Sequence, residues 1–402
     1  MNSFFEFHGE VPSSKSLWNR ALVVKSLSPF PFQIVGQSAS QDVDHLIKAM
    51  EGIPKGQVQF FCGDGGTTFR FLVLRLSRET GAFEVSGSRR LFSRPHEPLK
   101  DLLNQLGIQS DWESQRVVLR SKGWKKTEGL CVRGSESSQF ATGLLLAGVN
   151  LRSDLSFSVE KDIADYKYFQ MTLDFMSGLG FSVKKRDETI ILPAQSLPQK
   201  MSYFVEPDMS CAFPLACLGA LAGRCAFQNF PQNSLQPDFR FVSVLKQLGA
   251  KVALHDLTLF VEKVDRLRAL DIDLLQTPDL FPVLACTLAF AQGTSRLSGL
   301  DRLNYKESQR GQKILDLLLS LGFLCEIKNN FFVLEGRPSQ GDEFEVNEGQ
   351  NKIIDFDCDE DHRLAMAASI LKMKKAPVNI VNSHVVDKSF KGYFEILERS
   401  VR

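Results

Sequence analysis

The stretch Leu248-Gly249-Ala250-Lys251-Val252-Ala253-Leu254 joins the end of an apolar helical run to a strand-like segment. Glycine is the residue expected where a helix ends, and β-rich residues follow it. The same Leu-Gly phrase occurs at intervals of 73, 69 and 73 residues, in Leu106-Gly107, Leu179-Gly180, Leu248-Gly249 and Leu321-Gly322. The regular spacing disfavours a chance likeness between helix ends. A period near 70 in 402 residues predicts five to six copies of one β/α unit, and therefore mixed α/β packing.

A second phrase repeats 68 residues apart, as Phe213-Pro-Leu-Ala-Cys and Phe281-Pro-Val-Leu-Ala-Cys. An aspartate, Asp208 or Asp279, precedes each copy, and each copy opens an apolar helical run. We therefore expect equivalent helices in two of the repeated units.

Length and charge limit the possible classes of protein. A chain of 402 residues exceeds what one hydrophobic core usually supports, so we expect two domains. The net charge of +1 disfavours a generally basic surface for nucleic acid. Any binding of anions must come from charges that are clustered locally.

The cysteines, histidines and apolar runs indicate a cytoplasmic protein without a metal. The eight cysteines and six histidines are dispersed, and no CxxC pair is present, so we expect free thiols and neither a metal site nor a cofactor. Residues 1–15 lack the features of a signal peptide. The longest apolar run, Cys211 to Gly223, has only 13 residues and contains Pro214, which is too short for a membrane span.

The segment Pro12-Ser13-Ser14-Lys15-Ser16-Leu17-Trp18-Asn19-Arg20 is typical of a helix N-terminus. Such an end presents unpaired N–H groups and a positive partial charge, which Lys15, Ser16 and Arg20 would reinforce. The segment therefore favours an anion site. The alternative interpretation is an ordinary capped helix with a solvated lysine and arginine.

Three later junctions have similar chemistry. They are the glycine-rich turn Cys62 to Arg70, the hydroxyl-rich Gly134 to Phe140, and the acidic Asp357 to Arg363. Taken singly, each is better explained as a structural cap. Together they suggest helix N-termini that point to one shared cleft.

These segments resemble, in order along the chain, the motifs of the enolpyruvylshikimate-phosphate synthase family. Ser14 to Leu22 is similar to that family's "GSKSxSNRAL", and Gly63 to Arg70 to its "GNAGTAMR". The later similarities are Arg94-Pro95 to "RP", Ser137 to Phe140 to "SSQF", Tyr168 to Leu173 to "YxxxTL", Pro278-Asp279 to "PDA", Tyr305 to Arg310 to "xKETDR", Asp361 to Met366 to "DHRMAM", and Lys388 to Phe394 to "KTFxxYF". Nine collinear similarities are far more specific than any single motif.

The resemblance implies a two-domain α/β fold, the enolpyruvyl transferase fold. Each domain would consist of three βαβαββ units, an inside-out α/β barrel, with the active site in the interdomain cleft. Because the chain of this family crosses twice between domains, we expect one domain over residues 14–205 and the other over residues 1–13 and 206–402. The first would carry the acceptor-phosphate site, and the second the acid/base and phosphoenolpyruvate residues.

The implied reaction transfers the enolpyruvyl group of phosphoenolpyruvate to the 5-hydroxyl of shikimate 3-phosphate and releases phosphate. By resemblance, the shikimate 3-phosphate ligands are Lys15, Ser16, Arg20, Ser137, Ser138, Gln139, Tyr168, Asp279 and Lys306. The phosphoenolpyruvate ligands are Lys15, Gly66, Arg94, Gln139, Arg310, His362, Arg363 and Lys388. The resemblance implies no metal or cofactor and no nucleic-acid or membrane partner, and we expect a monomer.

Two carboxylates are the candidates for acid/base chemistry. By resemblance Asp279 removes the proton of the attacking hydroxyl, and Glu307 protonates the enol methylene. Lys15 and Lys388 are further candidates for proton transfer. Without the resemblance, Asp279 is better explained as a helix cap, and Glu307 as an i,i+3 partner of Arg310. We expect His362 to donate to a phosphate group and not to bind a metal.

Three positions depart from the family pattern. Asp165 stands where the family has a serine facing the substrate phosphate, Arg302 where it has an asparagine, and Asp64 replaces the asparagine of the turn. A carboxylate beside a phosphate is repulsive, so these changes leave the acceptor less certain than the donor. The alternatives are an enolpyruvyl transferase with another hydroxylated acceptor, or a catalytically silent homologue that binds anions. The branch acting on UDP-sugars is disfavoured, because its reactive cysteine near Arg94 is absent.

Overall fold

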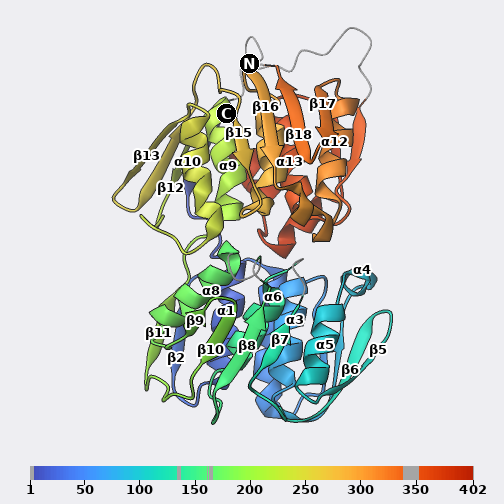
Figure 1. Ribbon diagram of the computed structural model, residues 1–402. Helices are drawn as coiled ribbons and strands as arrows, with labels where there is room; N and C mark the ends of the chain where they lie inside the picture. Colours follow the sequence, from blue (N-terminus) through green and yellow to red (C-terminus); the bar gives the residue numbers. More distant parts are fainter. Residues whose placement is uncertain (1–3, 134–136, 161, 163–165, 338–352, 402) are drawn as a thin grey trace. The chain divides into compact units, whose positions relative to one another are not determined.

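The computed structural model describes residues 4–133, 137–160, 162, 166–337 and 353–401. The chain forms two compact units. The N-terminal unit is the single segment Ser13–Val205, and the C-terminal unit combines Met1–Pro12 with Glu206–Arg402. Figure 1 gives the order of the elements in each unit.

Four sheets of the described residues follow one plan, two in each unit. Numbered in chain order, the first and second strands of each sheet are parallel, and the third and fourth form an antiparallel hairpin. The fourth strand pairs with the second, so the spatial order is first, second, fourth, third. In spatial order the N-terminal unit has β3 (Gln59–Phe61), β4 (Thr80–Ser86), β6 (Arg116–Lys122), β5 (Gln109–Trp112), and β7 (Leu130–Val132), β8 (Leu155–Val159), β10 (Thr189–Leu192), β9 (Lys184–Arg186). The C-terminal unit has β1 (Phe5–Gly9), β12 (Gly223–Phe227), β14 (Thr258–Glu262), β13 (Lys251–His255), and β15 (Asp271–Asp273), β16 (Gly293–Ser298), β18 (Phe331–Gly336), β17 (Leu324–Lys328).

The Leu-Gly repeat marks the same point in all four of these units. Each leucine follows the last residue of a helix, namely α5 (Glu97–Gln105), α8 (Lys167–Gly178), α10 (Phe241–Gln247) or α12 (Arg310–Ser320). Each glycine then adopts a left-handed conformation, with φ between +77° and +89°. Side chains with a Cβ avoid this conformation, so glycine ends the helix and turns the chain into the hairpin. The predicted repeat is confirmed.

The third repeat in each unit is shorter among the described residues. In the N-terminal unit it is the parallel pair β2 (Phe32–Val35) and β11 (Met201–Phe204), and in the C-terminal unit the parallel pair β19 (Ile354–Asp357) and β20 (Val378–Val381). The expected α/β fold of repeated units is therefore present, but these third repeats show no hairpin in the described ranges. In the N-terminal unit the chain enters and leaves within this repeat.

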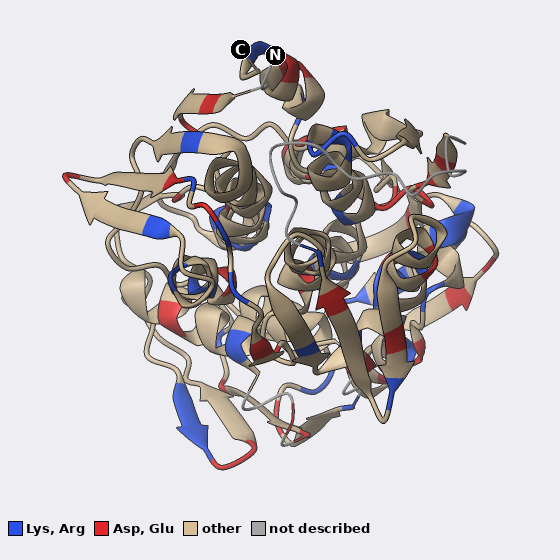
Figure 2. Ribbon diagram, turned by 90° about the horizontal axis from the view of Figure 1, so that it is seen from above, with Lys and Arg blue, Asp and Glu red and all other residues tan. Residues whose placement is uncertain are grey.

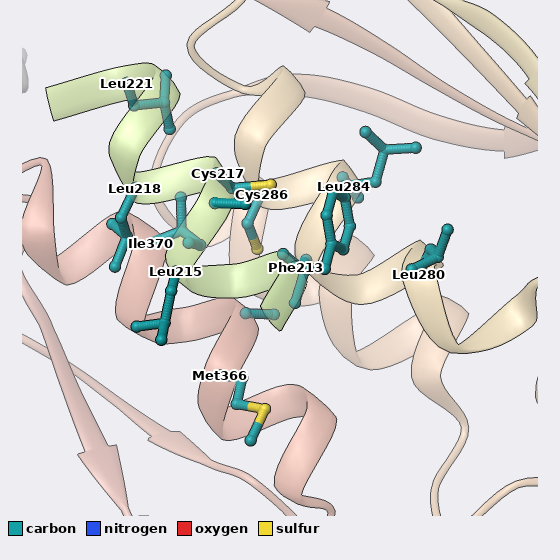
Figure 3. Close-up of a cluster of buried hydrophobic side chains, with 14 of the residues drawn as sticks. Phe213, Leu215, Cys217, Leu218, Leu221, Leu280, Leu284, Cys286, Met366 and Ile370 are labelled. Carbon is teal, nitrogen blue, oxygen red and sulfur yellow. The ribbon is translucent and has the colours of Figure 1, made fainter. Parts of the chain in front are cut away.

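Buried helices fill the centre of each unit. In the N-terminal unit they are α1 (Lys15–Leu27), α3 (Gly66–Leu76) and α6 (Gln139–Ala147), and in the C-terminal unit α9 (Met209–Ala222), α11 (Phe281–Leu288) and α13 (His362–Met373). Within each unit these helices pack against one another. Figure 3 shows side chains of α9, α11 and α13, among them Phe213, Leu284, Met366 and Ile370, meeting in one apolar cluster. Helices α9 and α11 carry no charged residue, and a helix that is apolar on all sides must be enclosed.

The remaining helices have a polar face or are short. They are α2 (Gln41–Gly52), α4 (Arg89–Ser93) and α14 (Tyr393–Arg399), together with the helices that precede the Leu-Gly turns. Figure 2 shows basic and acidic residues interspersed over both helices and strands. All eight cysteines are free, as predicted.

Candidate active site

The predicted site residues lie where the buried helices begin. Lys15, Gly66 and Gln139 are the first residues of α1, α3 and α6, and His362 is the first residue of α13. Asp279 belongs to the 3₁₀ turn η3 (Pro278–Leu280), which leads into α11. The first turn of a helix has N–H groups without intrahelical partners and carries a positive partial charge. Each unit therefore presents several helix N-termini suited to anions.

Arg20 is a buried cation on the second turn of α1, with only 3% of its surface exposed. Its Nε donates to Thr172 Oγ1 at 3.0 Å, Nη2 to the Tyr168 carbonyl at 3.1 Å, and Nη1 to the carbonyl and hydroxyl of Ser16. All these acceptors are neutral, and no carboxylate of the described residues pairs with Arg20. Burial lowers the pKa of Arg20 to about 10. A buried charge without a counter-ion is costly, which favours a ligand anion at this place.

Lys15 forms an ion pair that the sequence did not suggest. Its Nζ lies 2.9 Å from Oδ2 of Asp42, which is on the first turn of α2. The backbone carbonyl of Asp42 also accepts from Thr68 Oγ1 on α3, at 2.9 Å. Asp42 therefore joins the beginnings of α1, α2 and α3.

Arg94 lies against the N-terminus of α3. A Cβ built on Gly66 would overlap Nη1 of Arg94, so a side chain at this position would displace the end of Arg94 from the helix N-terminus. Arg70, on α3, donates to Gln139 Oε1, and Gln139 Nε2 donates to Thr67 Oγ1 at 2.9 Å. The structure thus brings Gly66, Arg94 and Gln139 together, with Arg70 as an additional cation.

The other predicted residues of the N-terminal unit, Ser137, Ser138 and Tyr168, make contacts with residues close to them in the sequence. Ser137 Oγ accepts from the backbone N–H of Gln139 at 3.2 Å, and Ser138 is buried as the residue before α6. Tyr168 lies on the first turn of α8, and its ring packs against Tyr166. Asp165 lies outside the described residues.

In the C-terminal unit, Arg310 binds three carboxylates. The guanidinium is 1% exposed and contacts Asp279 Oδ1 at 2.7 Å, Glu307 Oε2 at 2.8 Å and Asp361 Oδ2 at 2.8 Å. Burial alone would lower the pKa of Arg310, but Asp361, Glu307 and Asp279 outweigh it and raise that pKa well above its ordinary value. Arg310 is therefore a permanent cation that holds the two candidate acid/base groups at one point.

Asp279 has a second cationic partner, because Lys306 Nζ lies 2.9 Å from Oδ1. Burial would raise the pKa of Asp279, but Lys306, Arg310 and Arg363 together hold it well below its usual range. The carboxyl group is ionised at neutral pH and accepts bonds from side chains. It does not act as the simple helix cap that the sequence alone favoured, whereas Glu307 does form the i,i+3 pair with Arg310.

Arg363 is fixed by residues at the beginning of α9. Its Nη1 donates to the Ser210 carbonyl at 2.9 Å, and its Nη2 donates to the Ser210 hydroxyl. Asp208 caps α9 by accepting from the N–H groups of Ser210 and Cys211. The Nε of Arg363 is buried and has no hydrogen-bond partner in the described part of the chain. A ligand with an acceptor oxygen would satisfy this donor.

His362 and Lys388 complete the predicted set in this unit. His362 is 3% exposed at the beginning of α13, after the cap residue Asp361. Lys388, at the end of the 3₁₀ turn η5 (Ser383–Lys388), donates to the Glu360 carbonyl at 2.8 Å. Both therefore lie beside the N-terminus of α13.

Sequence reasoning missed several partners of these residues. Asp42, Arg70, Asp208 and Ser210 were not among the candidates, and Asp361 was noted only as part of a motif. A signal existed for three of them, since Arg70, Asp208 and Asp361 stand in the repeated helix starts. Nothing in the sequence pointed to the pairing of Asp42 with Lys15.

Two of the departures from the family pattern can be located. Asp64, before α3, accepts from the Ser88 hydroxyl. Arg302 is a buried residue of the 3₁₀ turn η4 (Leu300–Tyr305), which packs near η3. Both positions lie close to the helix N-termini described above.

Repeated α/β units, with buried arginines and paired carboxylates at helix N-termini, define a class of two-unit α/β proteins. The chain belongs to the EPSP synthase (3-phosphoshikimate 1-carboxyvinyltransferase) family, because residues 51–397 match the family model of that description.

Curated relatives and solved structures agree with this assignment. The 3-phosphoshikimate 1-carboxyvinyltransferase of Erwinia tasmaniensis is 29% identical over 419 residues, covering 97% of this chain and 95% of the relative. That of Psychromonas ingrahamii is 29% identical over 423 residues, covering 97% and 96%. Among solved structures, EPSP synthase from Acinetobacter baumannii gives a TM-score of 0.78 at 20% identity, covering 100% of this chain and 98% of that chain. The enolpyruvyl transferase NikO from Streptomyces tendae gives 0.67 at 14%, covering 99% and 96%.

The comparisons therefore support the expected two-domain enolpyruvyl transferase fold and the family suggested by the motifs. No helix of the described residues is both long enough and apolar enough to cross a membrane.

Proposed function

We propose that this chain transfers the enolpyruvyl group of phosphoenolpyruvate to the 5-hydroxyl of shikimate 3-phosphate and releases phosphate. The observation that carries the proposal is the cluster around Arg310, where Asp279, Glu307 and Lys306 meet at the beginnings of α11 and α12. Two carboxylates held by buried cations are what this reaction needs for moving protons at a site that binds anions.

Charge supports the choice of substrates. Two phosphates and two carboxylates bring roughly five to six negative charges, counting nearly two for each phosphate monoester. The proposed cationic ligands are Lys15, Arg20, Arg94, Lys306, Arg310, Arg363 and Lys388. In a chain of net charge +1, the proposal requires that these seven cations be used locally to balance the charge of the substrates. Arginine forks suit the two acceptor oxygens of carboxylate and phosphate.

The two units would divide the work. In this proposal the N-terminal unit supplies the ligands of the acceptor phosphate and carboxylate, with Arg20 as a central cation. The C-terminal unit supplies the acid/base residues and most ligands of phosphoenolpyruvate, among them Arg310, Arg363 and Lys388. Lys15, Gly66, Arg94 and Gln139 of the N-terminal unit would complete the phosphoenolpyruvate site.

In the proposed mechanism, Asp279 accepts the proton of the 5-hydroxyl as its oxygen bonds to C2 of phosphoenolpyruvate. Glu307, acting as a carboxylic acid, protonates C3, and a tetrahedral intermediate forms. The Glu307 carboxylate then takes a proton back from C3 while the C2–O bond to the phosphate breaks, and the proton held by Asp279 leaves with the phosphate. Anions bound to Lys306, Arg310 and Arg363 would reduce the field of these cations on Asp279, so substrate binding raises the pKa of Asp279 and makes it a better base.

The test is phosphate release by the purified chain with each substrate alone and with both together. The proposal requires release only when phosphoenolpyruvate and shikimate 3-phosphate are both present. Release with another hydroxylated acceptor would assign a different acceptor. Asp64, Arg302 and Asp165, which depart from the family pattern, are the reason to test other acceptors. Calorimetric binding of both substrates without release would indicate a silent homologue.

The proposal extends to the state of the protein in the cell. We expect a monomer in the cytoplasm that needs only its two small-molecule substrates. Light scattering of the purified chain should give a mass near 45.1 kDa, and a mass of twice that value would contradict the expected monomer.

A further inference from the structure

Thr172 belongs to the Tyr168–Leu173 motif, but the proposed ligands and acid/base groups do not include it. It lies on the second turn of α8 and is completely buried, 152 residues from Arg20 along the chain, yet its hydroxyl contacts the guanidinium. Thr142, on α6 and also completely buried, lies 3.1 Å from the same hydroxyl.

The donors and acceptors around Thr172 have only one consistent arrangement if every contact is a hydrogen bond. A hydroxyl donates one hydrogen bond and accepts two, and an arginine N–H can only donate. Thr172 Oγ1 therefore accepts from Arg20 Nε at 3.0 Å and donates to the Tyr168 carbonyl at 3.2 Å. The hydroxyl of Thr142 must then donate into the second lone pair of Thr172.

The Tyr168 carbonyl completes a ring of hydrogen bonds with Thr172 and Arg20. Tyr168 O also accepts from Arg20 Nη2 at 3.1 Å, so two nitrogens of one guanidinium are tied to a single turn of α8. On the other side, Nη1 uses both its hydrogens on the carbonyl and hydroxyl of Ser16, at 2.8 and 2.9 Å. Counting contacts within the described ranges, four of the five N–H groups of Arg20 are engaged, and one on Nη2 is left for a ligand.

We infer that Thr172 is a positioning residue that fixes the Arg20 guanidinium, so that Arg20 offers an acceptor anion one N–H and its charge instead of a two-pronged fork. The inference rests on the proposed function only in naming shikimate 3-phosphate as that anion. Preorganisation of this kind lowers the cost of binding, because the long side chain is already ordered.

The decisive variant is Thr172→Val, which keeps the shape and removes the acceptor. Arg20 Nε then loses its acceptor and the guanidinium is no longer fixed, so we expect KM for shikimate 3-phosphate to rise by about tenfold, the upper end of the cost of ordering one long side chain on binding. The KM for phosphoenolpyruvate and kcat should stay within about threefold. Thr172→Ser restores the acceptor and should return KM to within about threefold of the wild type.

Thr287→Val is the matched control. Thr287 is a completely buried threonine of α11 in the C-terminal unit, and its hydroxyl also donates to the carbonyl four residues earlier, at 2.7 Å. It removes the same atoms from the same kind of environment, so neither KM should change by more than about twofold. An equal rise of both KM values in Thr172→Val would mean a general loss of structure and would overturn the inference.

A second measurement needs neither substrate nor turnover. In ¹⁵N-labelled protein the Arg20 Nε–H, assigned by its disappearance in Arg20→Lys, should exchange slowly with water. The exchange should be at least roughly tenfold faster in Thr172→Val and slow again in Thr172→Ser. Equal exchange in all three proteins would refute the positioning role. Slow, Thr172-dependent exchange in a protein without turnover would refute the proposed function and leave the positioning role standing.

If Thr172→Val does not fold, Thr142→Val replaces it. This change removes the hydroxyl that donates to Thr172 and leaves the acceptor of Arg20 in place. We expect a smaller rise in KM for shikimate 3-phosphate, about threefold, with faster exchange of Arg20 Nε–H. Unchanged exchange would contradict the arrangement of donors and acceptors deduced above.

Discussion

Arg20 and Arg310 are both buried arginines near the beginnings of helices, yet their partners differ in kind. Arg20 of the N-terminal unit bonds only to hydroxyls and carbonyls, whereas Arg310 of the C-terminal unit bonds to three carboxylates. The first leaves a positive charge for a ligand to neutralise. The second is paired within the protein and holds the carboxylates of Asp279 and Glu307 in place. In the proposed function, one repeated architecture would therefore serve mainly for binding in one unit and for chemistry in the other.

The largest effect should follow Arg310→Met, which removes the cation that distinguishes the C-terminal cluster from the surroundings of Arg20. It leaves Asp279, Glu307 and Asp361 together without their shared cation, and breaking such buried pairs costs about 3–5 kcal/mol. We expect a loss of that size in the free energy of unfolding in urea, together with loss of turnover. A loss below about 1 kcal/mol would show that Arg310 is not the centre of the cluster.

Asp279→Asn should abolish the base and spare the fold. The amide keeps the size of the side chain but cannot accept the hydroxyl proton, so kcat should fall by about 10²- to 10⁴-fold. Steady-state kinetics measures the fall, and thermal unfolding provides the control for structure. Turnover within about threefold of the wild type would remove Asp279 from the mechanism.

Arg20→Met is the counterpart in the N-terminal unit. The partners of Arg20 are neutral, so removing this cation leaves no unpaired carboxylate, and the cost of burying the charge is also lost. The free energy of unfolding should therefore change by no more than about 2 kcal/mol. The KM for shikimate 3-phosphate should nevertheless rise at least roughly tenfold. Comparable destabilisation by Arg20→Met and Arg310→Met, measured in the same urea titration, would contradict the contrast between the two arginines.

Acid should weaken the N-terminal unit through His96. Its Nε2 lies 2.9 Å from the Leu91 carbonyl and so carries the hydrogen, which leaves Nδ1 bare and buried without a partner in the described residues. Burial, Arg70 and Arg94 lower the pKa of His96 to about 4. The unfolded state, with a pKa near 6.5, then binds more protons, and stability falls as pH drops from about 6.5 to about 4.

The three tryptophans, Trp18, Trp112 and Trp124, all belong to the N-terminal unit, so their fluorescence follows this unit. Urea unfolding monitored in this way should show lower stability at pH 5 than at pH 7. His96→Asn should show a smaller difference between these pH values and little change at pH 7. An equal loss in both proteins would assign the acid sensitivity to other groups.

The repeat could be predicted from sequence because its signal is local. Glycine commonly ends a helix by adopting a positive φ, and Gly107, Gly180, Gly249 and Gly322 supply that signal without reference to distant residues. The shorter third repeats could not be predicted in this way, because no Leu-Gly phrase marks them.

Site residues could be nominated, but their partners could not. Lys15 and Arg310 stand in motifs, whereas Asp42 lies 27 residues from Lys15, and Asp361 lies 51 residues from Arg310. Such pairs form only when the repeats bring separate helix N-termini together, so the sequence around one residue does not predict its partner. Asp279 shows the consequence, since its local sequence favoured a cap and its long-range contacts give it two cations.

The connection between the units bears on how the protein is made. The N-terminal unit is one uninterrupted segment, so all its contacts become available once Val205 has left the ribosome. Strand β1, translated first, pairs with β12, and Phe5 must wait for Gly223. During synthesis the earliest strand therefore stays without its neighbour until the whole N-terminal unit has emerged, and the C-terminal unit can complete this sheet only after that unit has been made.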